Sequence, residues 1–235
     1  MNRAAPCTAA AFALALSFGA AAEVQNRAVS GFSGVRLSVP GKMELIQGGT
    51  ESMTIEGATE DLARVETVVE DGVLHIRTQA QWKSSWNWNP KFRITVNAKN
   101  IDSLAISGSG DIMAKSLKSG SLKLAISGSG DIQIPALEAD NAVVAISGSG
   151  DVSLAGRTGT MSSNISGSGD LKASKLEARN VTVSIAGAGD VAVWAREVLQ
   201  VRIAGSGDVR YYGDPSVEKR IMGSGSVKRL GPSPG

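Results

Sequence analysis

The chain has 235 residues, of which 28 are glycine and only 4% are aromatic, and its 24 basic residues nearly balance its 22 acidic ones. This near-neutral charge excludes an electrostatic nucleic-acid binder, which needs a strongly basic face. A glycine-rich chain that is still 42% hydrophobic is neither disordered nor an ordinary helix bundle, so a β structure with many corners is expected.

Residues 1–22 have the features of a secretory signal peptide. Arg3 gives a weakly positive start, residues 9–18 form an apolar run too short to span a bilayer, and Ala20–Ala22 resembles a cleavage site. The one cysteine, Cys7, precedes the apolar run, so a lipid-attachment site is not expected there. We expect export to the periplasm or the cell surface, and a mature chain with no disulfide and no membrane span. The alternative is an alanine-rich helix that stays attached.

Residues 23–100 carry strand-like segments without a strict repeat. We expect a helical turn near Asp61, in the segment EDLARVETVVEDG, whose remainder is also compatible with a strand. This region is expected to form irregular coils that cover the first open edge of a β stack, because an uncovered edge invites aggregation. The expected strands are GVRLSVP (34–40), KMELIQ (42–47), SMTIEG (52–57), GVLHIRTQ (72–79) and FRITVNA (92–98).

Residues 101–231 repeat a glycine-serine-aspartate corner seven times. Successive copies are 18 to 20 residues apart, with no helical pattern between them. A steady period near twenty is typical of a solenoid, in which each unit buries its apolar face only by stacking on its neighbours. We therefore predict an all-β fold, a single-stranded β-helix with coils of about 18–20 residues. The aspartates of the motif are Asp111, Asp131, Asp151, Asp170, Asp190 and Asp208, with Ser226 in the seventh place.

Alternation within the repeat predicts which side chains face inward. Strands alternate faces with period two, so the isoleucine of each motif, both its glycines and the aliphatic residue after the aspartate are expected on the inner face. The glycines are also expected to allow a sharp corner with positive φ. Leu117, Leu137 and Leu176 are expected to close the far side of the coil. The two aliphatic columns are Ile106, Ile126, Ile146, Ile165, Ile185, Ile203 and Ile221, and Ile112, Ile132, Val152, Leu171, Val191, Val209 and Val227.

The aspartate column requires a compensating interaction. Stacked coils lie about 4.8 Å apart, so carboxylates in neighbouring coils repel one another. We expect each aspartate to cap its corner by accepting hydrogen bonds from backbone N–H groups. The alternative is a cation such as Ca²⁺, which takes several oxygen ligands. The period and aspartate density differ from those of calcium-binding nonapeptide repeats, so neither a metal nor a cofactor is expected.

Three of the four tryptophans, Trp82, Trp86 and Trp88, lie in the polar segment QWKSSWNWNP. Exposed tryptophan beside amide side chains can stack on a sugar ring or bind another protein surface. We therefore consider these residues candidates for contact with a glycan or an envelope protein. The alternative is that the indoles fold back and cover the coil.

Catalytic residues cannot be nominated from the sequence. His75 is the only histidine, and it lies in a strand-like alternation without an evident nucleophile partner. β-Helical polysaccharide lyases and hydrolases would need clustered acidic and basic residues in a groove, and the motif corners offer no basic residue at a fixed position. An enzyme is therefore the weaker alternative.

Several segments resemble a known family in a fixed order. They are FSGVRLSVPGKMELIQG, TIEGATEDLARVETVVEDGVLHI, FRITVNAKNIDSLAISGSGDI and the iterated SGSGD. Together they resemble the auto-transporter adhesin, head GIN domain family, bacterial envelope domains of unknown function, over about residues 29–230. The resemblance implies a β-helical domain over residues 23–231, an adhesin-like role and no catalytic residues.

Three functions are therefore considered for the mature chain. The first is an exported, non-catalytic module that binds or scaffolds in the cell envelope, through the outer serine and aspartate face or the tryptophan segment. The second is a carbohydrate-active enzyme, a polysaccharide lyase or hydrolase, on the same fold. The third is a purely structural spacer.

Overall fold

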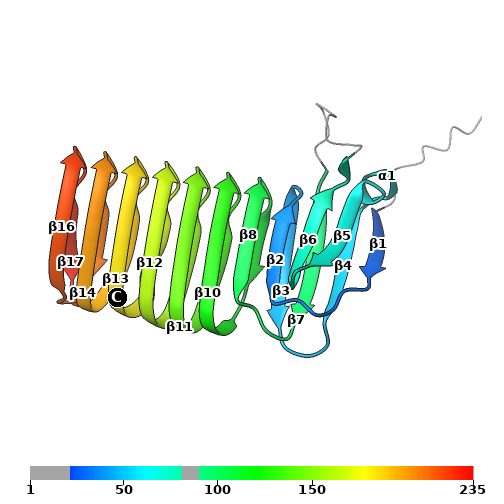
Figure 1. Cartoon of the computed structure of the whole chain (residues 1–235), viewed down its shortest axis with the longest axis horizontal. Coiled ribbons are helices and arrows are strands. Elements are labelled where there is room, and N and C mark those ends of the chain that lie inside the picture. The colour runs from blue at the N-terminus through cyan, green and yellow to red at the C-terminus, as the bar shows by residue number, and fades with distance from the viewer. Residues whose placement is uncertain (1–21, 81–89, 235) are drawn as a thin grey trace, which may run out of the picture.

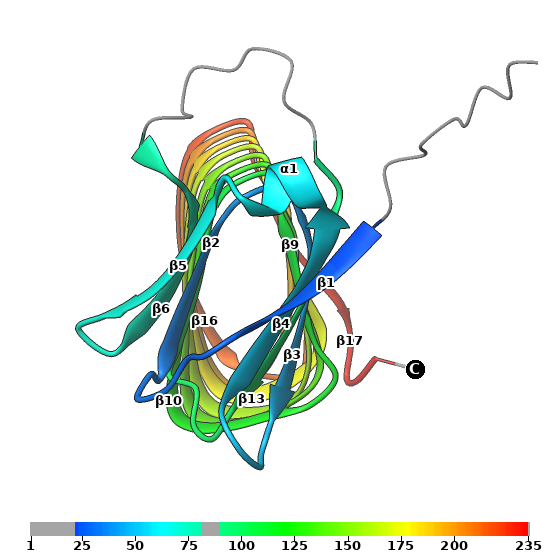
Figure 2. The same ribbon diagram turned by 90° about the vertical axis from the view of Figure 1, so that its right-hand side faces the viewer.

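The computed structural model describes residues 22–80 and 90–234, and nearly all of them belong to strands. The chain winds into a β-solenoid of about six turns, which forms an elongated stack (Figure 1). Viewed along the stack, the coils superpose as a flattened ring with two long walls (Figure 2). The predicted fold class is therefore confirmed.

Five long strands form the repetitive part, and each bends around the coil and contributes to both walls. Neighbouring coils pair in parallel and in register, so Ile126 lies opposite Ile106 on one side and Ile146 on the other. The same motif position therefore recurs at the same point of every coil. The five strands are β10 (Leu117–Gly128), β11 (Ile132–Gly148), β12 (Val152–Gly167), β13 (Leu171–Gly187) and β14 (Val191–Gly205).

The aliphatic columns form the core of this stack, as expected. The motif isoleucines from Ile106 to Ile203 are each at most 2% exposed, and the expected closing leucines, such as Leu137, are also buried. The expectation fails at the seventh copy, where Ile221 is 37% exposed and Val227 is only partly buried. Within the described chain no further coil stacks on this last one, so its inward row has no cover.

The two glycines of the motif have different roles. Gly128, at the first position, has φ +132°, and it is partly exposed, so the expectation that both glycines face inward is wrong for the first. Gly130, at the second position, is buried, and a Cβ there would collide with the carbonyl oxygen of Gly110 and lie 3.0 Å from Ile106 Cγ2. The first glycine adopts a positive φ, which residues with a side chain rarely do. The second glycine allows close approach to the preceding coil.

The N-terminal region confirms the five expected strands but not their stacking in chain order. β2 pairs in parallel with both β6 and β8, and β3 with both β7 and β9. The coil formed by β2 and β3 therefore lies between two coils that follow it in the sequence. The strands of these coils are β2 (Gly34–Ser38), β3 (Gly41–Gln47), β6 (Val73–Thr78), β7 (Phe92–Ala98), β8 (Ser103–Gly108) and β9 (Asp111–Ala114).

Antiparallel strands finish this end of the stack. β4 (Ser52–Ala58) lies between β7 and β1 (Ala22–Arg27), and β5 (Val65–Glu70) forms a hairpin with β6. The expected helical turn is present as α1 (Thr59–Leu62), which buries Leu62 and carries acidic residues in its first turn, where the helix dipole favours them. β1 and β5 are each paired on one side only among the described residues, and are therefore the edge strands here.

The other end finishes without such a cover in the described chain. β15 (Val209–Tyr212) pairs with β14 and with β17 (Val227–Gly231), and β16 (Ser216–Gly223) pairs with β14. Every residue of β16 is exposed. The two walls of the solenoid therefore end in the edge strands β16 and β17.

Candidate binding groove

The tryptophan segment proposed from the sequence cannot be placed. Trp82, Trp86 and Trp88 lie outside the described residues. Their contact with a ligand or partner stays a prediction.

The motif aspartates lie in a continuous ladder along one corner of the coil. Each described carboxylate accepts a hydrogen bond from the backbone N–H of the corresponding residue in the next coil, for example Asp151 Oδ1 from Asp170 N at 3.0 Å. The donor thus belongs to the neighbouring coil, whereas a donor in the same corner was expected from the sequence. At the last step Asp208 Oδ1 accepts from both N and Oγ of Ser226, at 2.9 Å each.

Basic side chains offset part of the repulsion in this column. Lys172 Nζ lies 2.6 Å from Asp151 Oδ2, and Arg210 lies 3.1 Å from Asp190 Oδ2. The hydrogen bond to Asp151, opposed by desolvation and aided by the neighbouring aspartates, raises the pKa of Lys172. No group of three or more potential metal ligands occurs among the residues that the structure describes.

Replacing Asp151 tests how much its hydrogen bond to the next coil stabilises the aspartate column. We expect Asp151→Ala to destabilise by about 1–2 kcal/mol, because the half-buried Asp170 N–H loses its acceptor. Asp151→Asn keeps an acceptor and should cost less than about 1 kcal/mol, since an exposed ion pair contributes little. Guanidinium unfolding measures both losses. Asp131→Ala is the control, because Asp131 accepts the same kind of backbone hydrogen bond but has no ion pair within the described residues. A large rise in melting temperature with Ca²⁺, lost in Asp151→Asn, would instead support a cation site.

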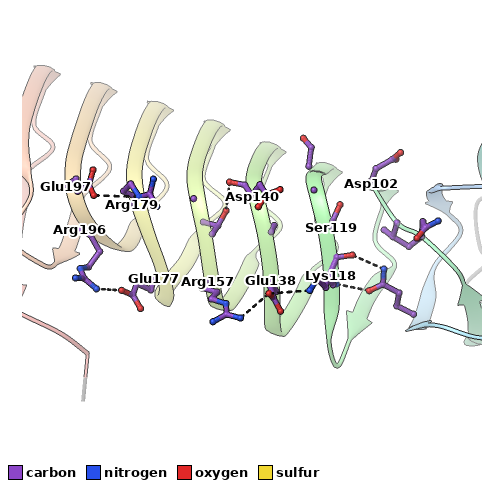
Figure 3. A pocket seen from close by; sticks show the side chains of 18 residues that line it. Asp102, Lys118, Ser119, Glu138, Asp140, Arg157, Glu177, Arg179, Arg196 and Glu197 are labelled. Atoms are coloured by element: carbon purple, nitrogen blue, oxygen red, sulfur yellow. Dashed lines mark hydrogen bonds and ion pairs between the residues drawn. The ribbon is translucent and has the colours of Figure 1, made fainter.

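A long groove of about 1500 Å³ follows another corner of the coils, away from the glycine motif. Its lining comes from the loop before β8 and from the bends of β10 to β14, so it runs along the axis of the stack (Figure 3). At about 4.8 Å per coil, the part between Lys118 and Arg196 is about 20 Å long. An extended chain could therefore meet several coils at once.

One side of the groove carries side chains of alternating charge. Lys118 pairs with Glu138 at 3.5 Å, and Glu138 also pairs with Arg157 at 3.0 Å. Two coils further, Arg196 pairs with Glu177. The five positions follow one another along the row in Figure 3, one from each coil, with signs that alternate from basic to acidic. We call this row of Lys118, Glu138, Arg157, Glu177 and Arg196 the charge ladder.

Small residues separate the charge ladder from a second row, which contains Asp140, Arg179 and Glu197 (Figure 3). Ser119, Ala139 and Thr158 lie between the rows, and Gly120 and Gly159 occupy the second-row position in the coils on either side of Asp140, which leaves space above the backbone. In total, four basic and five acidic side chains line the groove, so its charge is nearly balanced.

Gln47 lies at one end of the groove, where its side-chain amide bonds to the backbone of Lys118 as a neighbouring peptide group would. Its Nε2 donates to the carbonyl oxygen of Lys118 at 2.8 Å, and its Oε1 accepts from the Lys118 N–H at 2.7 Å. The first bend of the repetitive part is therefore held to β3 by a two-point contact.

Sequence reasoning missed the charge ladder, although a signal was present. Each member follows its motif aspartate by six or seven residues, as Glu138 follows Asp131 and Arg157 follows Asp151. The corner motif is nearly constant, whereas the residue type at the charge-ladder position changes from coil to coil, so the sequence repeat does not draw notice to it. Aligning the repeats and comparing charge at each offset would have shown the alternation.

Acid should remove the stabilisation that Glu138 contributes to the charge ladder. The hydrogen bond from Arg157, followed by the charges of Arg157 and Lys118, lowers the pKa of Glu138 below its usual value of about 4.5. A carboxylate with a lowered folded-state pKa stabilises above its unfolded-state pKa, and this contribution disappears as pH falls through the folded-state value. We expect wild type to be more stable than Glu138→Gln at pH 7, and the difference to vanish in acid. A difference that grows in acid would contradict the pairing.

Comparison with known proteins identifies the family. Residues 31–215 match the family described as "Putative auto-transporter adhesin, head GIN domain". The chain belongs to this family. No curated protein matches the chain significantly in sequence. The described residues contain no helix that is both long and apolar enough to cross a membrane.

Solved structures similar to this head GIN chain share its fold. A putative adhesin from Bacteroides fragilis is 24% identical with a TM-score of 0.84, over 90% of this chain and 98% of its own. A putative lipid binding protein from Parabacteroides distasonis is 25% identical with a TM-score of 0.73, over 89% and 96%. A putative adhesin from Parabacteroides merdae is 19% identical with a TM-score of 0.68, over 89% and 96%.

Proposed function

We propose that this head GIN chain is an exported, non-catalytic binding module of the cell envelope, in the periplasm or at the cell surface. In this proposal residues 1–22 are a cleaved signal peptide and residues 23–231 form the binding domain. Family membership and the likeness to putative adhesins support an adhesin-like role. The groove along the coils is the site that we assign to binding.

The observation that carries the proposal is the charge ladder. Every charge in it pairs with an opposite charge in an adjacent coil, so a polyanion or polycation would have to disrupt these pairs. A hydroxyl group both donates and accepts a hydrogen bond, so it can accept from Arg157 and donate to Glu138 together. A neutral glycan lying along the axis presents such groups repeatedly. We therefore propose an uncharged, extended glycan as the ligand.

A glycan array tests this ligand class. We expect a signal on neutral linear glycans that Arg157→Ala reduces strongly. Arg93→Ala is the matched control, because Arg93 is similarly exposed and pairs with Glu56 at 2.8 Å on another part of the surface. If both variants bind like wild type, the groove is not the site.

The tryptophan segment is the competing site in the same experiment. Loss of glycan binding in Trp86→Ala and Trp88→Ala, with Arg157→Ala unaffected, would move binding to that segment. Absence of binding to any glycan or envelope extract would favour a structural spacer. Turnover of a polysaccharide that depends on a single aspartate would instead favour an enzyme.

A further inference from the structure

The C-terminal end of the solenoid gathers most of the exposed apolar side chains. Among the described residues, eight large hydrophobic side chains are exposed, and five of them lie at this end. A soluble chain that scatters such residues singly needs no explanation, whereas a cluster on one surface indicates an interface. The five are Val198, Val217, Ile221, Met222 and Leu230; Val217 and Ile221 continue the inward rows, Val198 and Met222 alternate onto the outer face, and Leu230 lies in β17 of the other wall.

The apolar side chains of β16 extend the core columns beyond the last covered coil. Val217 and Ile221 lie in register with Leu199 and Ile203, which are buried, yet they are 38% and 37% exposed themselves. β16 pairs with β14 on one side, and its other side has no strand in the described structure. A further strand there would bury the exposed row and pair the free backbone groups.

Charge restricts which strand can dock on this end. Residues 214–231 contain four basic and two acidic residues, and the two acidic ones pair with Arg220 and Arg229. Among the basic residues, Lys219 lies in register with the buried Val201, so it belongs to the inward row that a docked strand would cover. A docked strand would therefore meet the positive charge of Lys219. Neither Lys219 nor Lys228 forms an ion pair in the part of the chain that the structure describes. Docking of the basic C-terminal end of a second copy is therefore disfavoured by charge repulsion, and a docking partner needs an acidic surface.

The opposite end of the same molecule has this acidic character. Residues 59–78, which include α1, β5 and β6, contain five acidic residues and two arginines, and Arg77 pairs with Glu66 and Glu70. This segment lies at the end of the stack that faces the viewer in Figure 2. Glu60 and Asp71 are exposed and form no ion pair among the described residues.

The strand order of the two ends is also compatible. Successive pairings place β5 and β16 at the two edges of one wall, and β1 and β17 at the two edges of the other. Stacking one molecule on the next would therefore bring β16 to β5 and β17 to β1, which continues both walls.

We propose that this chain associates head to tail, with the basic C-terminal end of one copy docked on the acidic N-terminal end of the next. Such a heterologous contact does not close on itself, so it forms open chains whose length depends on concentration. This inference is independent of the proposed glycan ligand.

Two complementary variants test the contact. One carries Lys219→Glu and Lys228→Glu at the C-terminal end. The other carries Glu60→Lys and Asp71→Asn at the N-terminal end, with asparagine chosen because residue 71 has φ +50°, which asparagine tolerates. The control carries Lys123→Glu and Lys175→Glu, which make the same charge change as the C-terminal variant on exposed positions of the walls. Circular dichroism verifies that all variants fold.

Sedimentation of protein purified from cells expressing the full chain gives the result. We expect wild type and the control to form species whose mass rises with concentration, and each end variant to stay monomeric. A mixture of the two end variants should associate again, into dimers through the two intact ends and into longer chains where the two reversed ends, which are again opposite in charge, also pair. Monomeric wild type at the highest soluble concentration, dimers of either end variant alone, or a monomeric mixture would overturn the proposal.

Discussion

Gly150→Ala is expected to destabilise the solenoid by about 3 kcal/mol, at the upper end of the cost of overpacking. The new Cβ would collide with the carbonyl oxygen of Gly130 and lie 2.8 Å from Ile126 Cγ2. Backbone of the preceding coil cannot move away without breaking the parallel pairing on which every later coil depends. Guanidinium unfolding followed by circular dichroism measures the loss.

The chain itself provides the control for this variant. Ser149→Ala changes the neighbouring outward position, where another copy of the motif already has alanine, Ala188. We expect this variant to unfold within about 0.5 kcal/mol of wild type, as exposed substitutions commonly do. Equal unfolding midpoints for Gly150→Ala and Ser149→Ala would show that close contact between corners is not required.

Ile146→Ala is expected to cost about 2–5 kcal/mol, the usual range for deleting a buried aliphatic side chain. Ile146 is 1% exposed and lies in register between Ile126 and Ile165. Truncation leaves a cavity in the middle of the column, where both neighbouring coils are fixed by their own strand pairing.

Ile221→Ala is the matched control, because it removes the same atoms from the same motif position. Ile221 is 37% exposed, so we expect a loss below about 1 kcal/mol. Similar losses for both variants would mean that burial between coils does not stabilise the column, contrary to the structure.

The repetitive half of the fold follows from the sequence because one unit is written seven times. Period-two alternation around Ile126 and the spacing of the motif are enough to predict parallel coils in register. The inner position of Gly130 follows from the same alternation. The partly exposed position of Gly128 does not follow from the alternation, because the positive φ of Gly128 interrupts the alternation at the corner.

The N-terminal half shows what local patterns omit. The strands were predictable from their hydrophobic alternation, but the position of the β2–β3 coil between later coils depends on long-range pairing with β6 and β8. The groove was missed for a related reason. Its two rows are polar, and only the stacking of coils brings Lys118, Glu138 and Arg157 together.

Distances between spin labels along one corner test the stacked-coil architecture most directly. In a chain with Cys7→Ser, cysteine labels would replace Ser109 together with Ser168, Ser206 or Ser224, which are three, five and six motif copies away. At about 4.8 Å per coil, the expected backbone separations are about 14, 24 and 29 Å, so the measured distances should rise linearly with the number of coils. Distances that do not increase with the number of coils would contradict the solenoid.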